Sequence, residues 1–196
     1  MKKIIVIGLA VVLVLTLGAG VALAAGKNGQ AGKSNVGHLY LCEKDPTDWS
    51  IVEDGAWGKM KYNLSGSTFD FVFNGHGLQP NTDYSLIYYA DTENRFVEWG
   101  GDNPGALIAT GTTNRGGNLH LGGSTELNMD LPHPDDANGY FYDYTQAPDN
   151  YANAHGAKIW LVPSSDYNAG MKKVIAWNPT QYLFETDLIT FDDTDV

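Results

Sequence analysis

The chain of 196 residues contains a single cysteine, so it cannot form an internal disulfide. It also lacks the motifs Gly-x-Ser-x-Gly, His-Glu-x-x-His and Cys-x-x-Cys, and it has no Gly-rich phosphate-binding loop ahead of a helix. These absences disfavour the hydrolases, zinc proteases, thiol redox enzymes and nucleotide-binding enzymes that are built on such motifs. Stability must come from packing alone.

Positive charge is also scarce, with 12 Lys and Arg against 23 Asp and Glu and a formal net charge of −11. No cluster of basic residues in the sequence offsets this acidity, and an acidic surface repels phosphate, so we expect no nucleic-acid partner. An acidic surface suits a salty or divalent-rich exterior, although solubility by itself also accounts for it.

The N-terminus has the three parts of a secretory signal peptide. Lys2 and Lys3 precede an apolar run from Ile4 to Ala25, and the small-x-small sequence Ala22-Leu23-Ala24 predicts cleavage after Ala24. Cleavage takes the net charge from −11 to −13. The alternative is that the segment is retained as an anchor, because about 20 apolar residues are enough to span a bilayer. We therefore expect a signal peptide over residues 1–24, a flexible spacer over 25–35 and one domain over 36–196.

Alternation of apolar and polar residues dominates the rest of the chain and predicts strands. Met60 and Tyr62 alternate with lysines, and Phe69, Phe71 and Phe73 form a second apolar face after a turn, so the two segments should pair as a hairpin. Further strands are expected at Asp83–Ala90, Ala106–Thr110, Asn118–Leu121, Lys158–Val162 and Tyr182–Phe191, with a hairpin turn at Asn114–Gly117.

This pattern predicts an all-β fold, since many short strands and Gly/Pro turns but no long amphipathic helix are present. We expect an antiparallel β-sandwich, Ig-like or jelly-roll, with one long loop. A closed β-barrel is the alternative.

The segment Gly77-Leu78-x-Pro80-x-Thr82-x-Tyr84 resembles the corner of Ig-like extracellular modules and of the copper/zinc superoxide dismutase and CHRD-type sandwiches. The dismutases carry paired metal-binding histidines on the strand that follows, but Tyr84–Tyr88 contains no histidine, so dismutase chemistry is disfavoured. The segments Ala157–Pro163 and Tyr182–Glu185 resemble secreted single-domain proteins of methanogenic archaea with no assigned function. This resemblance implies export.

The segment Asp130–Gly156 is too long and aperiodic for an ordinary connection and contains five aromatic residues, which argue against disorder. It has three interpretations: a lid over the sandwich, a ligand or glycan site, or a structural Ca²⁺ site. The ligand-binding candidates are Tyr140, Tyr142 and Tyr144, together with Trp99 outside the segment. The candidate Ca²⁺ ligands are the oxygen-bearing residues Asp135, Asp136, Asn138 and Asp143.

Several single residues carry more limited expectations. Trp160 lies in an apolar strand and should be core, whereas Trp49, Trp57 and Trp99 lie in loops, where each ring either caps the core or stacks on a sugar. Cys42 should be a partly buried structural thiol, or else the site of an intermolecular disulfide. Asn63 heads a glycosylation sequon.

The histidines are scattered singly, and His120 should lie on the solvent face of its strand. Glu98, Asp102 and Glu126 are possible hydrolase carboxylates, but a productive separation between two of them is a three-dimensional fact, so no catalytic residue is assigned.

The chain therefore fits a secreted or cell-surface, non-enzymatic β-sandwich with a structural, adhesive or ligand-binding role at the cell envelope. Its expected partners are a cell-envelope component, a glycan or a second copy of itself. The membrane is expected as a partner only through the N-terminal segment if that segment is retained. The alternative is an exported glycan-active hydrolase whose carboxylates converge only in the fold.

Overall fold

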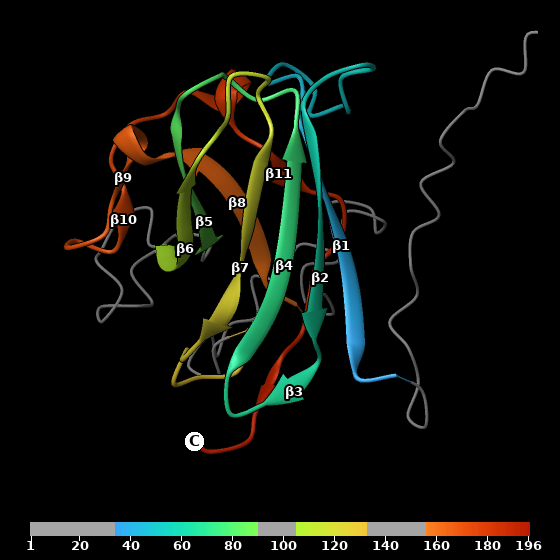
Figure 1. Cartoon of the computed structure of the whole chain (residues 1–196), viewed down its shortest axis with the longest axis vertical. Coiled ribbons are helices and arrows are strands. Elements are labelled where there is room, and N and C mark those ends of the chain that lie inside the picture. The colour runs from blue at the N-terminus through green and yellow to red at the C-terminus, as the bar shows by residue number, and fades with distance from the viewer. Residues whose placement is uncertain (1–33, 90–104, 133–155) are drawn as a thin grey trace, which may run out of the picture.

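The computed structural model describes residues 34–89, 105–132 and 156–196, which form an antiparallel β-sandwich (Figure 1). One sheet has five strands in the order β11-β1-β2-β4-β7, and the other has three in the order β6-β5-β8. The first comprises β1 (Val36–Cys42), β2 (Trp57–Asn63), β4 (Phe69–His76), β7 (Leu119–Thr125) and β11 (Phe184–Glu185). The second comprises β5 (Asp83–Tyr89), β6 (Gly105–Thr112) and β8 (Lys158–Pro163).

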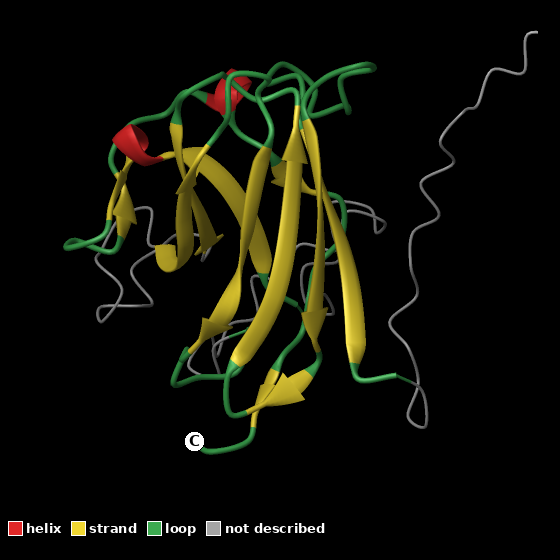
Figure 2. Cartoon of the chain, viewed as in Figure 1, coloured by secondary structure: helices red, strands yellow, loops and turns green. Residues whose placement is uncertain are grey.

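Four very short strands and two 3₁₀ turns complete the described elements (Figure 2). Strand β3 (Ser65–Gly66) pairs in parallel with β12 (Asp192–Asp193), and β9 (Tyr167–Asn168) pairs with β10 (Lys173–Val174). The 3₁₀ turns are η3 (Ser164–Asp166) and η4 (Pro179–Gln181). No helix in the described part of the chain is long and apolar enough to cross a membrane.

The predicted hairpin and its core face are confirmed. Strands β2 and β4 pair with Tyr62 opposite Phe71 and Met60 opposite Phe73, and all four side chains are buried. The alternation works because successive side chains of a strand point to opposite faces. Gly58 lies on the same inner face and leaves room for the Phe73 ring, whose nearest carbon would be 2.2 Å from an added Cβ.

Strands β5 and β8 are apolar on both faces because the smaller sheet lies between two cores. Leu86 and Leu161 belong to the main core between the sheets. Ile87, Trp160 and Val162 belong to a second cluster on the opposite face, which also contains Tyr182 and Phe184. The expected core position of Trp160 is therefore confirmed, in the outer of the two clusters.

The alternative of a closed barrel is wrong for the described strands. On one side the sheets join, because Leu183 bonds to Leu161 of β8 through both backbone groups, at 3.0 and 2.9 Å, while the next residue, Phe184, pairs with β1. On the other side β6 and β7 pair with different neighbours and leave the sandwich open.

One sequence expectation about connections is wrong, the hairpin at Asn114–Gly117. The turn at Asn114–Gly117 forms, with the Asn114 side-chain oxygen accepting from the backbone N–H groups of Gly116 and Asn118. It joins β6 to β7 across the two sheets, however, and makes no hairpin. The connection after β4 also crosses, and leads to β5 in the opposite sheet. Local turn chemistry specifies a reversal but not the sheet that receives the next strand.

The predicted strand Tyr182–Phe191 is also wrong as one element. This segment makes short pairings with different partners in succession: Leu183 with Leu161, Phe184 with Cys42, Ile189 with Ala157 and Phe191 with Leu131. Its apolar side chains are buried, which explains the strand-like pattern, but the backbone crosses between sheet edges and does not follow one of them.

Candidate functional site

Most of the residues singled out in the sequence lie outside the described residues. This applies to Trp99, Tyr140, Tyr142 and Tyr144, to the Ca²⁺ candidates Asp135, Asp136, Asn138 and Asp143, and to the cleavage position Ala24. The Ca²⁺ site, the ligand-binding loop and the cleavage site stay predictions.

The structure instead brings together an aromatic patch, formed by Trp49 and Trp177 on the surface with Trp160, Tyr182 and Phe184 beneath them. Trp49 and Trp177 are 48% and 52% exposed, and their ring centroids are 6.2 Å apart. Phe184 lies under both, at 5.3 Å from Trp49 in an edge contact and 6.2 Å from Trp177. Trp160 is 5.9 Å from Trp177 and Tyr182 is 5.5 Å from it. Two half-exposed indoles thus rest on buried aromatic rings.

Trp177 is positioned by a buried polar network around Asp166, at the end of η3. The Asp166 carboxylate accepts hydrogen bonds from the Tyr182 hydroxyl and from the Asn178 side-chain amide, each at 2.9 Å. The Asp166 carbonyl accepts from the backbone N–H of Ile175 at 2.8 Å. These bonds fix the chain on both sides of Trp177, and from this position the indole packs over Phe184.

Trp49 is positioned by the loop between β1 and β2 and has a left-handed backbone conformation, with φ of 62°. The backbone N–H of Trp49 donates a hydrogen bond to the Asp45 carbonyl at 2.7 Å. The Asp45 carboxylate accepts from the backbone and hydroxyl of Thr47, at 2.8 and 2.7 Å. A bulky residue with positive φ is an outlier that costs on the order of 1 kcal/mol, so the surrounding hydrogen bonds impose this conformation.

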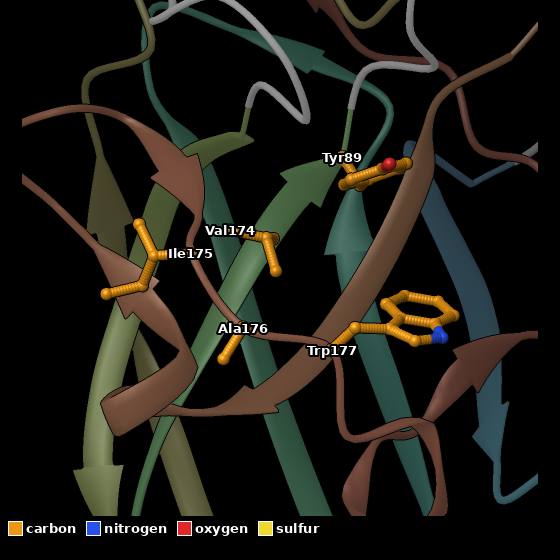
Figure 3. A pocket seen from close by; sticks show the side chains of 5 residues that line it. All are labelled: Tyr89, Val174, Ile175, Ala176 and Trp177. Atoms are coloured by element: carbon orange, nitrogen blue, oxygen red, sulfur yellow. The ribbon is translucent and has the colours of Figure 1, made fainter.

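A pocket of about 270 Å³ adjoins the patch and is lined by Tyr89, Val174, Ile175, Ala176 and Trp177 (Figure 3). Tyr89 ends β5 and stacks on Trp160, with ring centroids 3.7 Å apart and planes within 10°. Ile175, like Trp177, is 52% exposed. The pocket wall therefore combines these apolar and aromatic side chains with a comparable amount of polar surface.

Trp160 supplies an unpaired polar group beneath this surface. It is 6% exposed, and its indole N–H has no hydrogen-bond acceptor among the described residues. A buried donor without a partner costs about 1–3 kcal/mol and calls for an explanation such as a bound water or ligand.

The sequon residue Asn63 is half-buried and its side chain is engaged. Its amide nitrogen donates to the carbonyls of Ser65 and Thr68 at 3.1 and 2.9 Å, and its oxygen accepts from the Asp70 N–H at 2.8 Å. These bonds shape the turn between β2 and β4. A glycan on this nitrogen would remove at least one of them, so modification would have to precede folding of the turn.

Cys42 is more buried than expected. It is 6% exposed and forms no disulfide, and burial raises the pKa of its thiol, opposed by the nearby Lys44. A raised pKa lowers the thiolate fraction, as in an inert structural cysteine. His120 is exposed on its strand as expected.

Two carboxylates near the C-terminus, those of Asp193 and Asp195, form structural contacts. The Asp193 carboxylate is buried and accepts from the Met129 N–H at 3.1 Å. A hydrogen bond with Asp193, and then the charges of Asp193 and Glu126, raise the pKa of Asp195. Within the described ranges, no group of three or more His, Cys, Asp or Glu side chains is placed to hold a metal ion. Glu98 and Asp102 lie outside those ranges.

The sequence missed Trp177 because the segment around it has no periodicity, although an aromatic between Ala176 and Asn178-Pro179 resembles the loop setting of Trp49. The loop position expected for Trp57 is wrong, because Trp57 is the first residue of β2. Only the fold brings Trp177 beside Trp49, 128 positions earlier in the chain.

The chain matches no family model, no curated protein and no solved structure.

Proposed function

We propose that this chain is a secreted or cell-surface, non-enzymatic β-sandwich that binds a glycan of the cell envelope through the aromatic patch. The observation that carries the proposal is the half-exposed pair of Trp49 and Trp177, with ring centroids 6.2 Å apart over buried aromatic rings. An exposed indole provides a flat apolar face for the C–H groups of a pyranose ring, while the polar groups around it remain wet.

Two further features support a binding role for this surface. Both indoles are held in place before any ligand arrives, and preorganisation lowers the entropy lost on binding. Trp49 also keeps a strained backbone, and strain of this kind concentrates at functional sites. The unpaired Trp160 N–H lies beside the same rings.

Replacing Trp49 by Ala is expected to weaken binding to the target glycan at least about tenfold, which corresponds to about 1.4 kcal/mol. Trp177→Ala should have a comparable effect, whereas Trp177→Phe should retain part of the affinity because a ring remains. A neutral-glycan array identifies the ligand, and calorimetry on the best ligand gives the dissociation constants.

Met171→Ala is the control, because it removes a large apolar side chain of similar exposure, 51%, that belongs neither to the aromatic patch nor to the pocket lining. It should leave neutral-glycan affinity unchanged. Thermal melts of each variant separate loss of binding from loss of folding. Equal affinity of folded Trp49→Ala, Trp177→Ala and unsubstituted protein would contradict the proposal.

The export part of the proposal has its own test. Protein recovered from the medium or the cell surface should begin at Ala25 or Gly26, because the peptidase cuts after the small-x-small sequence that ends at Ala24. N-terminal sequencing of that material measures this directly. Recovery of the intact N-terminus, and only from membranes, would show that the segment is retained as an anchor.

A further inference from the structure

The outer face of the five-stranded sheet gathers basic and aromatic side chains into cross-strand rows, and we call it the basic face. One row contains Tyr40, Lys59, Asn74 and His120, which are register partners across β1, β2, β4 and β7. The row on one side of it contains His38, Lys61 and Val72, and the row on the other side contains Trp57 and His76. The four long strands lie side by side in Figure 1.

The two lysines of this face are unusual in a chain with a net charge of −11. Lys59 and Lys61 are both exposed, and neither forms an ion pair with a residue of the described ranges. Within these rows the basic face holds Lys59, Lys61 and three histidines, and Asp70 occupies the next position on the same side of β4.

The positive charge of the face helps to lower the pKa of one of its own residues. The pKa of His38 is lowered, first by partial burial and then by the charges of Lys59 and Lys61. The effect of both lysines on one imidazole shows that their charges act on the same area of the sheet. An anionic group placed there would meet two ammonium groups on neighbouring positions of β2.

Aromatic and amide groups give the face a fixed shape. The Lys59 ammonium lies 5.4 Å from the centroid of the Tyr40 ring, and Trp57 and His76 have centroids 4.7 Å apart. His120 and His76 hydrogen-bond through Nδ1 to the side-chain oxygens of Asn74 and Asn118, at 2.8 and 2.9 Å. These contacts hold both imidazoles in place.

We propose that the basic face binds an anionic polysaccharide, with Lys59 and Lys61 contacting its carboxylate or sulfate groups and Tyr40 and Trp57 flanking its sugar rings. The inference deepens the proposed glycan binding, on which it rests for the class of ligand, but it concerns a different surface. Cys42, which lies between Phe184 and Trp57 in the sheet register, separates the aromatic patch from the basic face.

Charge complementarity favours this occupant, because two exposed lysines without an ion-pair partner in the described ranges attract a polyanion, while the flanking rings suit sugars. The competing occupant is the acidic surface of a second copy of this chain. That alternative makes no particular use of the exposed Trp57 ring, and it predicts self-association without any polysaccharide.

The test compares polygalacturonate with its fully methyl-esterified form, and dextran sulfate with dextran, at low salt and with a chelator present. The chelator removes divalent ions that would bridge two acidic polymers. Each charged polymer should bind at least about tenfold more tightly than its uncharged counterpart, and binding should weaken with salt because exposed charges are screened. The carboxylated and sulfated arms distinguish the two sources of negative charge.

The variant Lys59→Gln with Lys61→Gln should lose at least about tenfold in affinity for the charged polymer. Lys172→Gln with Lys173→Gln is the matched control, because it changes the net charge equally at the start of β10, away from the basic face, and it should bind as the unsubstituted protein does. Equal losses in both double variants, or equal binding of charged and uncharged polymers, would overturn the proposal.

Sedimentation of the protein without polysaccharide tests whether a second copy of the chain binds the basic face. Salt-sensitive self-association that the Lys59/Lys61 variant abolishes, together with no polysaccharide binding, would assign the face to a second copy and overturn the proposal. This test can fail separately from the test of the aromatic patch. The patch is tested with neutral glycans and the Trp49 and Trp177 variants, whereas the basic face is tested with charged polymers and the Lys59/Lys61 variant.

Discussion

Replacing Phe71 by Ala is expected to lower the free energy of unfolding by about 3–5 kcal/mol. Phe71 is 4% exposed in the main core and stacks on Phe69, with centroids 5.8 Å apart. It also faces Tyr62 across the β2–β4 pair. Truncation removes the apolar contacts of the ring and leaves a cavity that the two sheets can close only in part. Denaturant titration measures the loss.

The next residue on the same strand provides the control. Val72 points to solvent with 43% of its surface exposed, so Val72→Ala should change the stability by no more than about 0.5 kcal/mol. A loss below about 1 kcal/mol for Phe71→Ala, or a larger loss for Val72→Ala, would show that the faces of β4 are inverted. The pair of variants thus tests the strand register directly.

The domain is expected to unfold cooperatively in alkali, starting near pH 10. Burial raises the pKa of Tyr167 to about 12. Burial also raises the pKa of Tyr62, with a contribution from Asp187, and that of Tyr182, with a contribution from Asp166. In the unfolded chain these hydroxyls ionise near pH 10.

The direction of the effect follows from proton linkage. A tyrosine with a raised pKa keeps its proton in the folded state at a pH where the unfolded chain has already released it. Its contribution to stability is therefore complete below about pH 10 and is lost as the pH rises toward the folded-state value. Each such tyrosine removes on the order of 1.4 kcal/mol per pH unit in this window, so three together remove about 8 kcal/mol by about pH 12, which is comparable to a typical domain stability.

The measurement is tyrosinate absorbance against pH, followed in parallel with circular dichroism. The buried tyrosines should ionise together with the loss of sheet structure. Tyr62→Phe should make stability less steeply dependent on pH above 10, because one linked proton is gone. Gradual ionisation of every tyrosine with the sheet intact above pH 12 would contradict the burial of these hydroxyls.

The strands and their faces were predictable from the sequence because they depend on local periodicity. The alternation in Lys59–Tyr62 and Phe69–Phe73 can place apolar groups on one side only when the backbone is extended. The same logic identified Trp160 as core. The uninterrupted apolar run of β8 also carries a signal of burial on both faces, which the second cluster around Tyr182 explains.

The candidate site was not predictable in the same way. The sequence placed Trp49 and Trp57 in loops, but it did not indicate that Trp177 would lie beside Trp49. Their contact depends on Phe184, whose segment passes from β8 to the edge of β1. Lys59 and Lys61 are visible in the sequence as the polar side of one strand. Their histidine neighbours come from β1, β4 and β7.

By itself, the sequence determined the all-β class, the inward faces of β2 and β4, the core position of Trp160 and the acidity of the chain. Each of these properties follows from composition or from neighbours a few residues apart. Only the tertiary structure decided that the turns after β4 and β6 cross between sheets, that the chain near Phe184 joins them, and that Trp49 meets Trp177. Those outcomes depend on which sheet edge receives each strand, and this choice is made by burial of apolar surface over the whole domain and not by any local pattern.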